Sequence, residues 1–309
     1  MVGEGRSWKI TVPASTANLG PGFDSIGLSL SLYLTLDAEE AERWEVIPLS
    51  PELEDFPRDE EHFIVGVAME VAERHGKVHP PCKLSVESNI PLTRGLGSSA
   101  AAVIAGVELA NAACGLNLTM RDKLKEANRF EGHPDNVGAS LYGGLVIATQ
   151  SGDDVEFVSI QDPAFDVVAV IPPTELKTSE AREALPDELS FGESVLAGSV
   201  SNVLVAALLT GDLETAGRMM KADRYHQPYR KSLLPHYDLV ERTALGAGAF
   251  GVALSGAGPT IACFTGKGEG ADLANEMKQS FPHMLVRHLL ITSEGSSVLE
   301  KPKVRPFPL

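Results

Sequence analysis

Residues 91–102 read Pro91-Leu92-Thr93-Arg94-Gly95-Leu96-Gly97-Ser98-Ser99-Ala100-Ala101-Ala102. They follow a segment, residues 82–87, whose apolar and polar side chains alternate as in a strand, and they lead into an alanine-rich run that ends near Gly115. A glycine-rich turn that opens a helix presents backbone N–H groups beside the positive end of the helix dipole. The stretch therefore predicts a strand, a phosphate-binding loop and a helix in succession.

Two glycines and two serines give this loop its chemistry. Gly95 and Gly97 lack the Cβ atoms that would keep a bulky anion away from the main chain. Ser98 or Ser99 can cap the helix or offer a hydroxyl to a phosphate-bound Mg²⁺. The loop is neither a Walker A loop nor a GxGxxG fingerprint. The alternative, a capped helix after an ordinary turn, needs only one serine and one glycine, so the density of both favours a phosphate site.

Composition limits the class of protein. The chain has 309 residues, enough for two domains, and its hydrophobic content of 43% is typical of a globular protein. Its formal net charge of −16 argues against nucleic acid and against an anionic membrane as partners. No apolar run approaches the roughly 18–20 residues that cross a bilayer, and the first residues lack the apolar core of a signal peptide. Three scattered cysteines suit a reducing compartment, so we expect a cytoplasmic protein.

The order of predicted elements indicates an α+β fold with mixed or antiparallel sheets backed by helices. Residues 9–36 read as two strands about a Gly/Pro turn, residues 37–61 as a surface excursion, and residues 250–264 as a strand–turn–strand unit. Helices are expected at 62–74, 119–129, 178–185, 193–209, 212–221 and 270–280, and further strands at 145–149, 155–160 and 167–171. We place the boundary between two domains near residue 160, which gives domains 1–160 and 161–309.

A second candidate site segment lies near the amino terminus. Asn18 and Asp24 flank a turn that contains Gly20, Pro21 and Gly22. An amide and a carboxylate projecting into one pocket would suit a hydroxyl and an ammonium group. The spacing fits equally well an Asx-turn pair that only holds its own loop.

A third segment reads Glu131-Gly132-His133-Pro134-Asp135-Asn136-Val137-Gly138. A glutamate that faces the serines of the loop would supply the carboxylate that Mg²⁺ prefers. The alternative is a helix that ends at the Gly-His-Pro run, with Asp135 and Asn136 as turn formers. A single histidine without a second one at ligand spacing argues against zinc.

Three segments of the second half are ambiguous on their residues alone. Residues 177–186 read as a capped amphipathic helix with Arg182 in solvent, and Arg230 reads as a surface arginine. The run Leu254-Ser255-Gly256-Ala257-Gly258-Pro259-Thr260 suits a tight turn where backbones approach closely, or a hairpin with no role in a site.

Taken in order, these segments resemble the motifs of the GHMP small-molecule kinases, named for galactose, homoserine, mevalonate and phosphomevalonate. The resemblance covers nearly the whole chain. Residues 15–24, STANLGPGFD, closely match the amino-terminal motif of homoserine kinases, residues 133–136 match their HxDN segment, and residues 178–186 match T-x-E-A-R-x-x-L-P. Residues 255–260, SGAGPT, match the third GHMP motif. The match predicts that this turn packs against the phosphate loop or the turn at 18–24.

The resemblance implies a two-domain GHMP kinase fold. The amino-terminal domain would be a mixed α/β domain with a left-handed βαβ-type phosphate loop, and the carboxy-terminal domain would be ferredoxin-like α+β. The substrate cleft would lie between them. The implied activity is ATP-dependent phosphorylation of the side-chain hydroxyl of L-homoserine, and many relatives are homodimers. Two rivals remain open: a GHMP kinase for another small hydroxylated metabolite, and a non-catalytic ATP-binding protein of the same fold.

The resemblance also assigns site residues, with ATP and Mg²⁺ as cofactors. Homoserine would be bound by Asn18, Asp24, His133, Asn136, Thr178, Arg182 and Arg230. The nucleotide would be bound by His62, Pro91, Arg94, Gly95, Leu96, Gly97, Ser98, Ser99 and Ala100. Ser99 and Glu131 would hold the metal, with Glu126 as the alternative to Glu131. The catalytic set would be Asn18, Glu131, Asn136 and Arg182.

Two positions depart from patterns in the wider family. Many other GHMP kinases carry a catalytic aspartate where this sequence has Asn136, so the usual candidate base is absent here. Without an obvious base, the hydroxyl proton could go to the γ-phosphate itself, and the identity of any general base stays open. Family members commonly carry an asparagine in the adenine pocket where Glu61-His62-Phe63-Ile64 stands here. His62 could stack on the purine or form a hydrogen bond to it instead.

Overall fold

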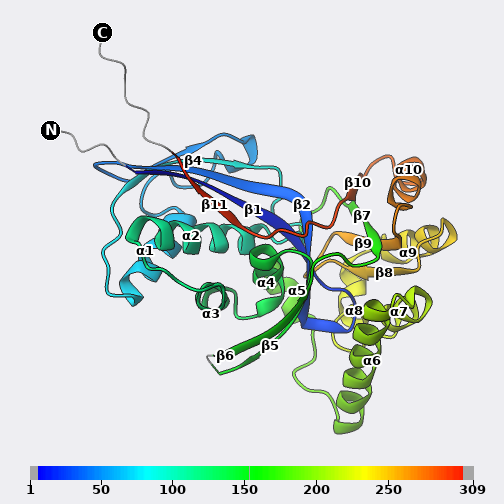
Figure 1. Ribbon diagram of the computed structural model, residues 1–309. Coiled ribbons are helices and arrows are strands. Elements are labelled where there is room, and N and C mark those ends of the chain that lie inside the picture. Colours follow the sequence, from blue (N-terminus) through cyan, green and yellow to red (C-terminus); the bar gives the residue numbers. More distant parts are fainter. Residues whose placement is uncertain (1–5, 153, 302–309) are drawn as a thin grey trace.

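The computed structural model describes residues 6–152 and 154–301, whose strands form two sheets (Figure 1). The first sheet has seven strands in the order β11-β1-β2-β4-β3, with β5 paired to β2 and β6 to β5. Among the strands of the described residues, only β3 and β4 pair in parallel. The strands are β1 (Ser7–Asn18), β2 (Gly22–Glu40), β3 (Glu45–Pro48), β4 (Cys82–Ser88), β5 (Leu145–Ser151), β6 (Asp154–Ile160) and β11 (Ser297–Glu300).

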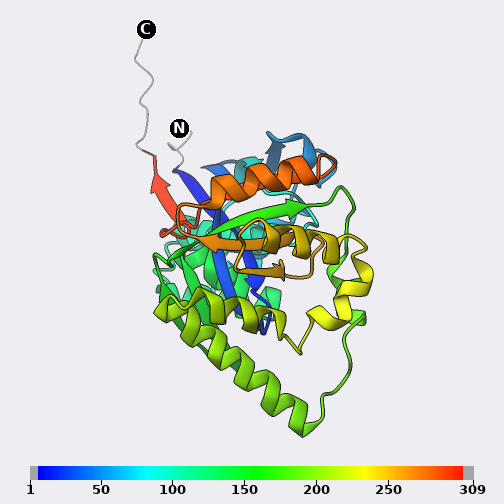
Figure 2. The ribbon, with the colours of Figure 1, turned by 90° about the vertical axis from the view of Figure 1, so that its right-hand side faces the viewer.

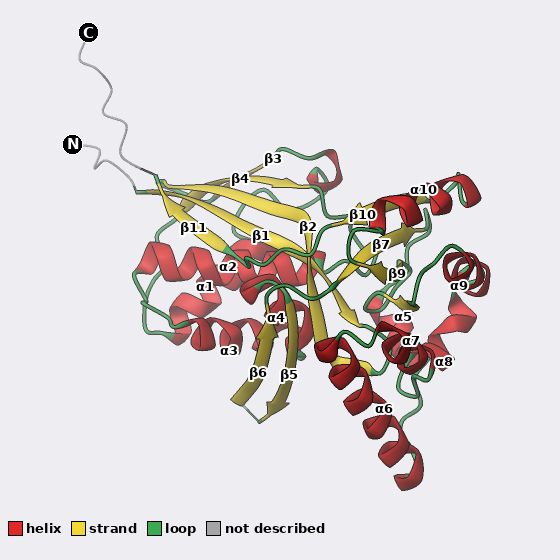
Figure 3. Cartoon of the chain, turned by 45° about the vertical axis from the view of Figure 1, so that its right-hand side comes forward, coloured by secondary structure: helices red, strands yellow, loops and turns green. Residues whose placement is uncertain are grey.

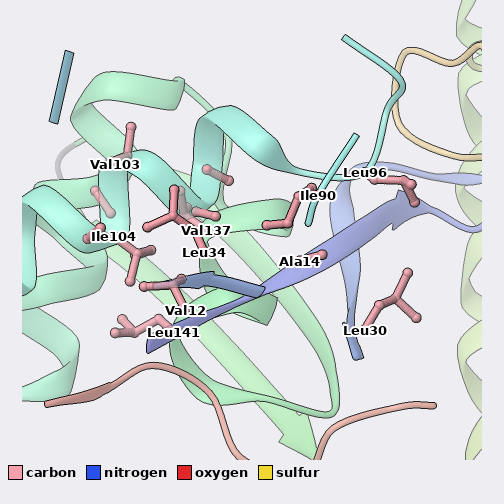
Figure 4. Close-up of a cluster of buried hydrophobic side chains, with 14 of the residues drawn as sticks. Val12, Ala14, Leu30, Leu34, Ile90, Leu96, Val103, Ile104, Val137 and Leu141 are labelled. Carbon is pink, nitrogen blue, oxygen red and sulfur yellow. The ribbon is translucent and has the colours of Figure 1, made fainter. Parts of the chain in front are cut away.

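The helices between β4 and β5, together with the helix before β4, cover one side of this sheet (Figure 3). They are α1 (Phe63–Arg74), α2 (Ser98–Cys114), α3 (Met120–Glu131) and α4 (Pro134–Tyr142). Strands β4 and β5 both run antiparallel to β2 and are therefore parallel to each other, with α2, α3 and α4 between them in sequence. This is the βαβ unit expected around the phosphate loop. The helices bury their apolar side chains against β1 and β2, where Val12, Leu34, Val103, Ile104 and Val137 meet (Figure 4).

The second sheet has the strand order β10-β7-β9-β8, all antiparallel (Figure 2). Its strands are β7 (Phe165–Ile171), β8 (Gly251–Leu254), β9 (Ile261–Gly266) and β10 (Leu285–Leu289). Numbered along the chain, this is the order 4-1-3-2, the arrangement of a ferredoxin-like sheet. The helices of this half are α5 (Thr178–Glu183), α6 (Phe191–Thr210), α7 (Leu213–Lys221), α8 (Gln227–Arg230), α9 (Tyr237–Gly246) and α10 (Gly270–Ser280). The predicted α+β class is confirmed.

Most predicted elements of the chain are present, with ends shifted by a few residues. Thr119 caps α3 as expected: its Oγ1 accepts from the Asp122 N–H, and the Asp122 carboxylate accepts from the Thr119 N–H. The surface excursion predicted for residues 37–61 is wrong in part. β2 continues to Glu40, β3 joins the sheet, and Val46 is buried.

Several short elements were not expected: α4, α8, α9, β10 and β11. The helix end predicted at residues 132–134 is followed at once by a new helix, because Pro134 occupies the first turn of α4, where its missing N–H costs nothing. Strand β11 pairs with β1, so the chain returns to the first sheet at its carboxyl end. The domain boundary near residue 160 stays a prediction.

Candidate active site

One cavity of about 1470 Å³ is lined by residues from both halves of the chain. All of the predicted site residues lie on its wall: Asn18, Asp24, His62, Pro91, Arg94, Gly95, Leu96, Gly97, Ser98, Ser99, Ala100, Glu131, His133, Asn136, Thr178, Arg182 and Arg230. The structure thus brings together segments that are far apart in sequence, and it places the phosphate loop next to the turn at residues 18–24.

The phosphate loop leads directly into α2, whose first residue is Ser98. The N–H groups of the first turn have no partner inside the helix, so they are available to a ligand. Gly95 and Gly97 both have positive φ, 74° and 70°. A Cβ on Gly95 would lie 2.2 Å from the Ser255 carbonyl oxygen, and one on Gly97 would lie 2.2 Å from Ser15 Oγ. These glycines are therefore needed so that the loop can pack against Ser255 and Ser15. Their predicted role of leaving room for an anion is a separate one.

Arg94 of the same loop reaches across to the second half. Its Nη2 donates to the Pro173 carbonyl oxygen at 2.9 Å, and its Nη1 lies 3.3 Å from a Glu175 carboxylate oxygen. The guanidinium therefore ties the loop to the segment that follows β7. Its charge is shared with Glu175 at the rim of the cavity.

A hydroxyl and a carboxylate meet at the start of α2. Ser99 Oγ donates to Glu131 Oε1 at 2.6 Å. Glu126, the alternative metal ligand, is buried and already paired, with one carboxylate oxygen 2.7 Å from Arg74 Nη2 and the other 3.1 Å from His75 Nε2. The oxygen pair that faces the phosphate loop is therefore that of Ser99 and Glu131.

The turn between β1 and β2 is held by an amide. Asn18 Oδ1 accepts from the Asp24 backbone N–H at 3.0 Å, and Asn18 Nδ2 donates to the Gly256 carbonyl oxygen at 3.0 Å. Asn18 and Asp24 both have positive φ, 75° and 53°, a conformation that is uncommon for non-glycine residues but that asparagine and aspartate adopt more readily than others. The Asn18 side chain thus fixes the turn, as the Asx alternative proposed. The Asp24 carboxylate remains directed into the cavity.

Asp24 is paired across the cavity with Arg182 of α5. Arg182 Nη2 lies 3.1 and 3.2 Å from the two Asp24 carboxylate oxygens, and Nη1 lies 3.2 Å from one of them. Arg182 lies on a helix and its side chain is 42% exposed, so it faces solvent in part while it also pairs with Asp24 across the cavity. Its guanidinium also lies 5.7 Å from the centre of the Phe23 ring. The ion pair joins the first half of the chain to the second.

Arg230 lies deeper than any surface arginine and is only 2% exposed. Its Nε donates to the Ala181 carbonyl oxygen at 2.9 Å and its Nη1 to the Gly256 carbonyl oxygen at 3.2 Å. No carboxylate forms an ion pair with it within residues 6–152 and 154–301. Burial, followed by the nearby charge of Arg182, lowers the pKa of Arg230 to about 10. A buried guanidinium of this kind on a cavity wall is suited to an anionic ligand.

The corner between α3 and α4 contributes an imidazole with a buried partner. His133 Nδ1 lies 2.5 Å from Asp135 Oδ1, and that oxygen also accepts from the Asn136 N–H at 2.7 Å. Asn136 Oδ1 accepts from Ser15 Oγ at 2.9 Å. Asp135 is 1% exposed, and its carboxylate contacts His133. The interpretation of Asp135 as a turn former did not include this contact. The only signal was its position in the first turn of the helix that Pro134 opens.

Acidic groups around His133 control its charge. Burial by itself lowers the pKa of His133, but the hydrogen bond and charge of Asp135, together with the charges of Asp24 and Glu131, raise it above 6.5 overall. Ligand atoms of Asp24, His133 and Asp135 all lie within 4.8 Å of one another. The negative charge of Asp24 and Asp135 in this corner is therefore balanced in part by the protonated His133 ring and, at Asp24, by Arg182.

The Gly-rich turn at residues 255–260 packs against both of the other motifs, which confirms the predicted packing. Ser255 Oγ lies 2.6 Å from the Gly95 carbonyl oxygen and 2.7 Å from Thr16 Oγ1. The Gly256 N–H donates to the Ala17 carbonyl oxygen, and the Thr260 N–H donates to the Arg94 carbonyl oxygen. The turn therefore fixes the position of the phosphate loop relative to β1.

Comparison with known proteins agrees with this arrangement. Residues 62–144 match the model of the GHMP kinases N terminal domain, and residues 204–283 match the GHMP kinases C terminal model. The homoserine kinase of Shouchella clausii is 47% identical over 94% of this chain and 98% of its own length. That of Bacillus licheniformis is 48% identical over 95% of this chain and 96% of its own. The chain belongs to the GHMP kinase family.

Solved structures give the same result. A homoserine kinase from Cytophaga hutchinsonii superposes with a TM-score of 0.83 at 30% identity and covers 95% of this chain and 97% of the other. A mevalonate kinase from L. major, at 16% identity and a TM-score of 0.68 over 93% of this chain and 95% of its own, shares the fold. The predicted two-domain GHMP kinase fold is confirmed.

The unusual His62 of this GHMP kinase caps α1. Its Nδ1 accepts from the Ile64 N–H at 3.2 Å, and burial lowers its pKa. The ring also faces Phe56 edge-on, with 6.4 Å between ring centres. The imidazole is therefore neutral at the wall of the cavity, where Phe63 adds a half-exposed ring. Contact of His62 with adenine stays a prediction.

Proposed function

We propose that this GHMP kinase transfers the γ-phosphoryl group of ATP to the side-chain hydroxyl of L-homoserine, giving O-phospho-L-homoserine, a step of threonine biosynthesis. The observation that carries the proposal is the charge pattern of the cavity. The buried Arg230 lacks an ion-pair partner among the described residues, the Asp24 carboxylate lies on the wall of the same cavity, and so does the phosphate loop. An amino acid with a hydroxyl side chain fits these three features: its carboxylate suits Arg230, its ammonium suits the acidic group, and its hydroxyl can receive a phosphoryl group.

The phosphate side of the site consists of backbone donors and two oxygen ligands. N–H groups of residues 95–99 bind the phosphates of ATP. Ser99 and Glu131 fit Mg²⁺, because a hydroxyl and a carboxylate oxygen stand 2.6 Å apart beside the helix start. When bound there, Mg²⁺ neutralises negative charge that develops on the phosphates.

The acceptor side holds the amino acid by its two charges. Arg182 and Arg230 bind the carboxylate, Asp24 binds the ammonium, and His133, Asn136 and Thr178 complete the pocket. The Asp24–Arg182 ion pair must open as the substrate enters, and a dipolar amino acid replaces both halves of it. Asn18 acts by holding the turn that carries Asp24.

The chemistry depends mainly on alignment, as in other phosphoryl transfers. The homoserine hydroxyl oxygen forms a bond to the γ-phosphorus while the bond from that phosphorus to the bridging oxygen of ADP breaks. Asn136 cannot take up a proton, and its Oδ1 already accepts from Ser15. The hydroxyl proton therefore passes to a γ-phosphate oxygen.

A substrate panel tests the proposal. ADP release is measured by a coupled assay with homoserine, threonine, serine and mevalonate at the same concentrations. We expect the highest kcat/KM with homoserine, because it alone combines both charges with a hydroxyl of the right reach. Mevalonate turnover equal to that of homoserine would favour a kinase for another metabolite. ATP binding without ADP release on any of the four would favour a non-catalytic ATP-binding protein.

The last part of the proposal concerns the compartment and the oligomeric state. We propose a cytoplasmic homodimer. Cys82, Cys114 and Cys263 are free thiols, and burial raises the pKa of Cys82 and of Cys263 to about 12, so both stay protonated in a reducing compartment.

A further inference from the structure

Both arginines that are proposed to bind the substrate carboxylate lie over the ring of Phe23. The centre of that ring is 5.2 Å from Cζ of Arg230 and 5.7 Å from Cζ of Arg182. A guanidinium within about 6 Å of an aromatic ring is attracted by the negative face of the ring. The two cations therefore share one aromatic support, although their charges repel each other.

A buried histidine stacks on the same ring. The ring centres of His226 and Phe23 are 5.4 Å apart, their planes are inclined by 20°, and the imidazole is fully buried. His226 directly precedes α8, and Arg230 is the last residue of that helix. One helical turn therefore brings the imidazole next to the guanidinium.

The partners of the imidazole fix the position of its hydrogen. Nε2 of His226 lies 3.0 Å from the Gly20 carbonyl oxygen and 3.4 Å from a carboxylate oxygen of Asp223, and an oxygen of either kind accepts. Nδ1 lies 3.3 Å from Nη1 of Arg230, which can only donate. The hydrogen is therefore on Nε2, and the bare Nδ1 accepts from Arg230. Burial lowers the pKa of His226 and so favours this neutral form.

The contact with His226 helps to fix the whole guanidinium of Arg230. Nε donates to the Ala181 carbonyl oxygen, and Nη1 donates both to His226 and to the Gly256 carbonyl oxygen. Nη2 has no hydrogen-bond partner in the part of the chain that the structure describes, and Arg230 lies on the wall of the cavity. Because a guanidinium is planar, the contacts at Nε and Nη1 also determine where Nη2 lies. Nη2 is thus placed for a ligand by the contacts of the other two nitrogens.

We propose that His226 is a positioning residue for the carboxylate of the substrate. Its bare Nδ1 holds Nη1 of Arg230, so that Nη2 stays directed at the carboxylate of the bound amino acid. Phe23 limits the rotation of both groups. The inference rests on the proposed homoserine kinase activity, with Arg230 as a ligand of the carboxylate. His226 is not among the residues that line the cavity, so it acts through Arg230 on binding of the amino acid and leaves binding of ATP unchanged.

Two amide substitutions separate the contacts of the imidazole. In His226→Gln the amide nitrogen takes the place of Nε2 and keeps the hydrogen bond to Gly20, but no acceptor is left at the position of Nδ1. In His226→Asn the amide oxygen takes the place of Nδ1 and accepts from Arg230, but the hydrogen bond to Gly20 is lost. Both variants lose the ring that stacks on Phe23, so both should lose stability.

Steady-state kinetics of the full chain, with homoserine and ATP varied in turn, tests the proposal. His226→Gln should raise the KM for homoserine about 10-fold, the effect of one hydrogen bond to a charged group. Its kcat and its KM for ATP should stay at the wild-type values. His226→Asn should keep a homoserine KM close to that of the wild type. His79→Gln is the matched control, because His79 is also buried but lies outside the cavity lining, and it should leave both KM values unchanged.

An unchanged homoserine KM in His226→Gln would overturn the proposal. An equal rise in His226→Asn, or a parallel rise in the KM for ATP, would also overturn it, because a general loss of folded structure gives either result. Nitrogen NMR of the wild-type imidazole is a test that needs no variant: a hydrogen on Nδ1 of His226 would contradict its role as acceptor. A wild type that does not phosphorylate homoserine would instead contradict the proposed function.

Discussion

The ion pair between Asp24 and Arg182 joins two residues that were each expected to bind a different end of the same substrate. In this structure they neutralise each other at 3.1–3.2 Å. Their presence and their roles could be inferred from the residues that resemble the family motifs. Their direct contact could not, because it depends on how α5 of the second half lies over the turn of the first.

Replacing Arg182 by leucine should raise the KM for homoserine by roughly 10- to 100-fold, the loss expected for about 1.5–3 kcal/mol of hydrogen bonding to a charged group. The KM for ATP should change little, because the phosphate loop is untouched. Steady-state kinetics with each substrate varied in turn measures both. Arg218→Leu on α7 is the control, because Arg218 is an exposed arginine paired with Glu214 away from the cavity. An unchanged homoserine KM in Arg182→Leu would remove Arg182 from carboxylate binding.

Two other residues show where the residue types alone are not enough. Arg230 reads as a surface arginine, yet it is buried because α5 covers it and the Ala181 carbonyl accepts its Nε–H. Asp135 reads as a turn former, yet its carboxylate orients His133. Burial of a charged group depends on tertiary packing, which local spacing does not specify.

At the scale of elements, the turn at residues 255–260 connects the other motifs. Its small residues were expected to let another backbone segment come close. The contacts of Ser255 with Gly95 and Thr16 show that these segments are the phosphate loop and β1. The sequence also indicated α2 and α3 with useful accuracy, because a glycine-rich start and a capping box are local signals. The nine-residue helix α4 had no such signal apart from Pro134, which marks a helix end as readily as a helix start.

Ser255→Ala should lower the free energy of unfolding by about 1–3 kcal/mol, because it leaves buried partners without their hydrogen bonds. It should also weaken nucleotide binding several-fold, since the phosphate loop loses its contact at the Gly95 carbonyl. Thr119→Ala is the matched control: it removes the cap of α3 at a cost of about 1 kcal/mol but lies outside the cavity lining. Urea denaturation and titration with a fluorescent ATP analogue measure the two effects. Equal nucleotide affinity in both variants would contradict a positioning role for the turn.

At the scale of the whole molecule, the two halves meet over a buried histidine. His226, from the second half, has its Nε2 3.0 Å from the Gly20 carbonyl oxygen of the first. Its ring stacks on Phe23 at 5.4 Å between centres. Burial is the main reason why the pKa of His226 is lowered, to about 4; the charge of Asp223, 3.4 Å away, opposes the shift, and the nearby Arg230 charge adds to it.

This histidine should make stability depend on pH between about 4 and 6.5. The unfolded chain binds a proton at His226 over this range and the folded chain does not, so stability rises with pH and is lost as the pH falls, by up to about 1.4 kcal/mol per pH unit. Denaturant unfolding at a series of pH values measures the slope. His226→Gln should reduce the slope, whereas His236→Gln, at an exposed position, should keep it. Equal slopes in His226→Gln and the wild type would show that the contact does not govern the pH response.

The overall architecture could be expected only through the resemblance, because the 4-1-3-2 strand order is not visible in any local pattern. Periodicity indicated the long, half-buried strands such as β2. It missed β11, whose four residues, Ser297–Glu300, include no fully buried side chain and therefore show no apolar alternation. Strand β10 buries Val286 and Leu289, but its five residues include Arg287 and His288, so the stretch is too short and too polar to stand out as a strand.

The pairing of β11 with β1 has a consequence for synthesis of the protein. Trp8 lies opposite Glu300 in the register of these strands, so the first and last described strands of the chain are neighbours. A nascent polypeptide leaving the ribosome presents β1 long before its partner has been translated. Until then, one margin of that strand is free to recruit other chains, as unprotected strand edges do. Completion of the amino-terminal sheet therefore waits for the synthesis of residues 297–300, even though most of its residues are made first.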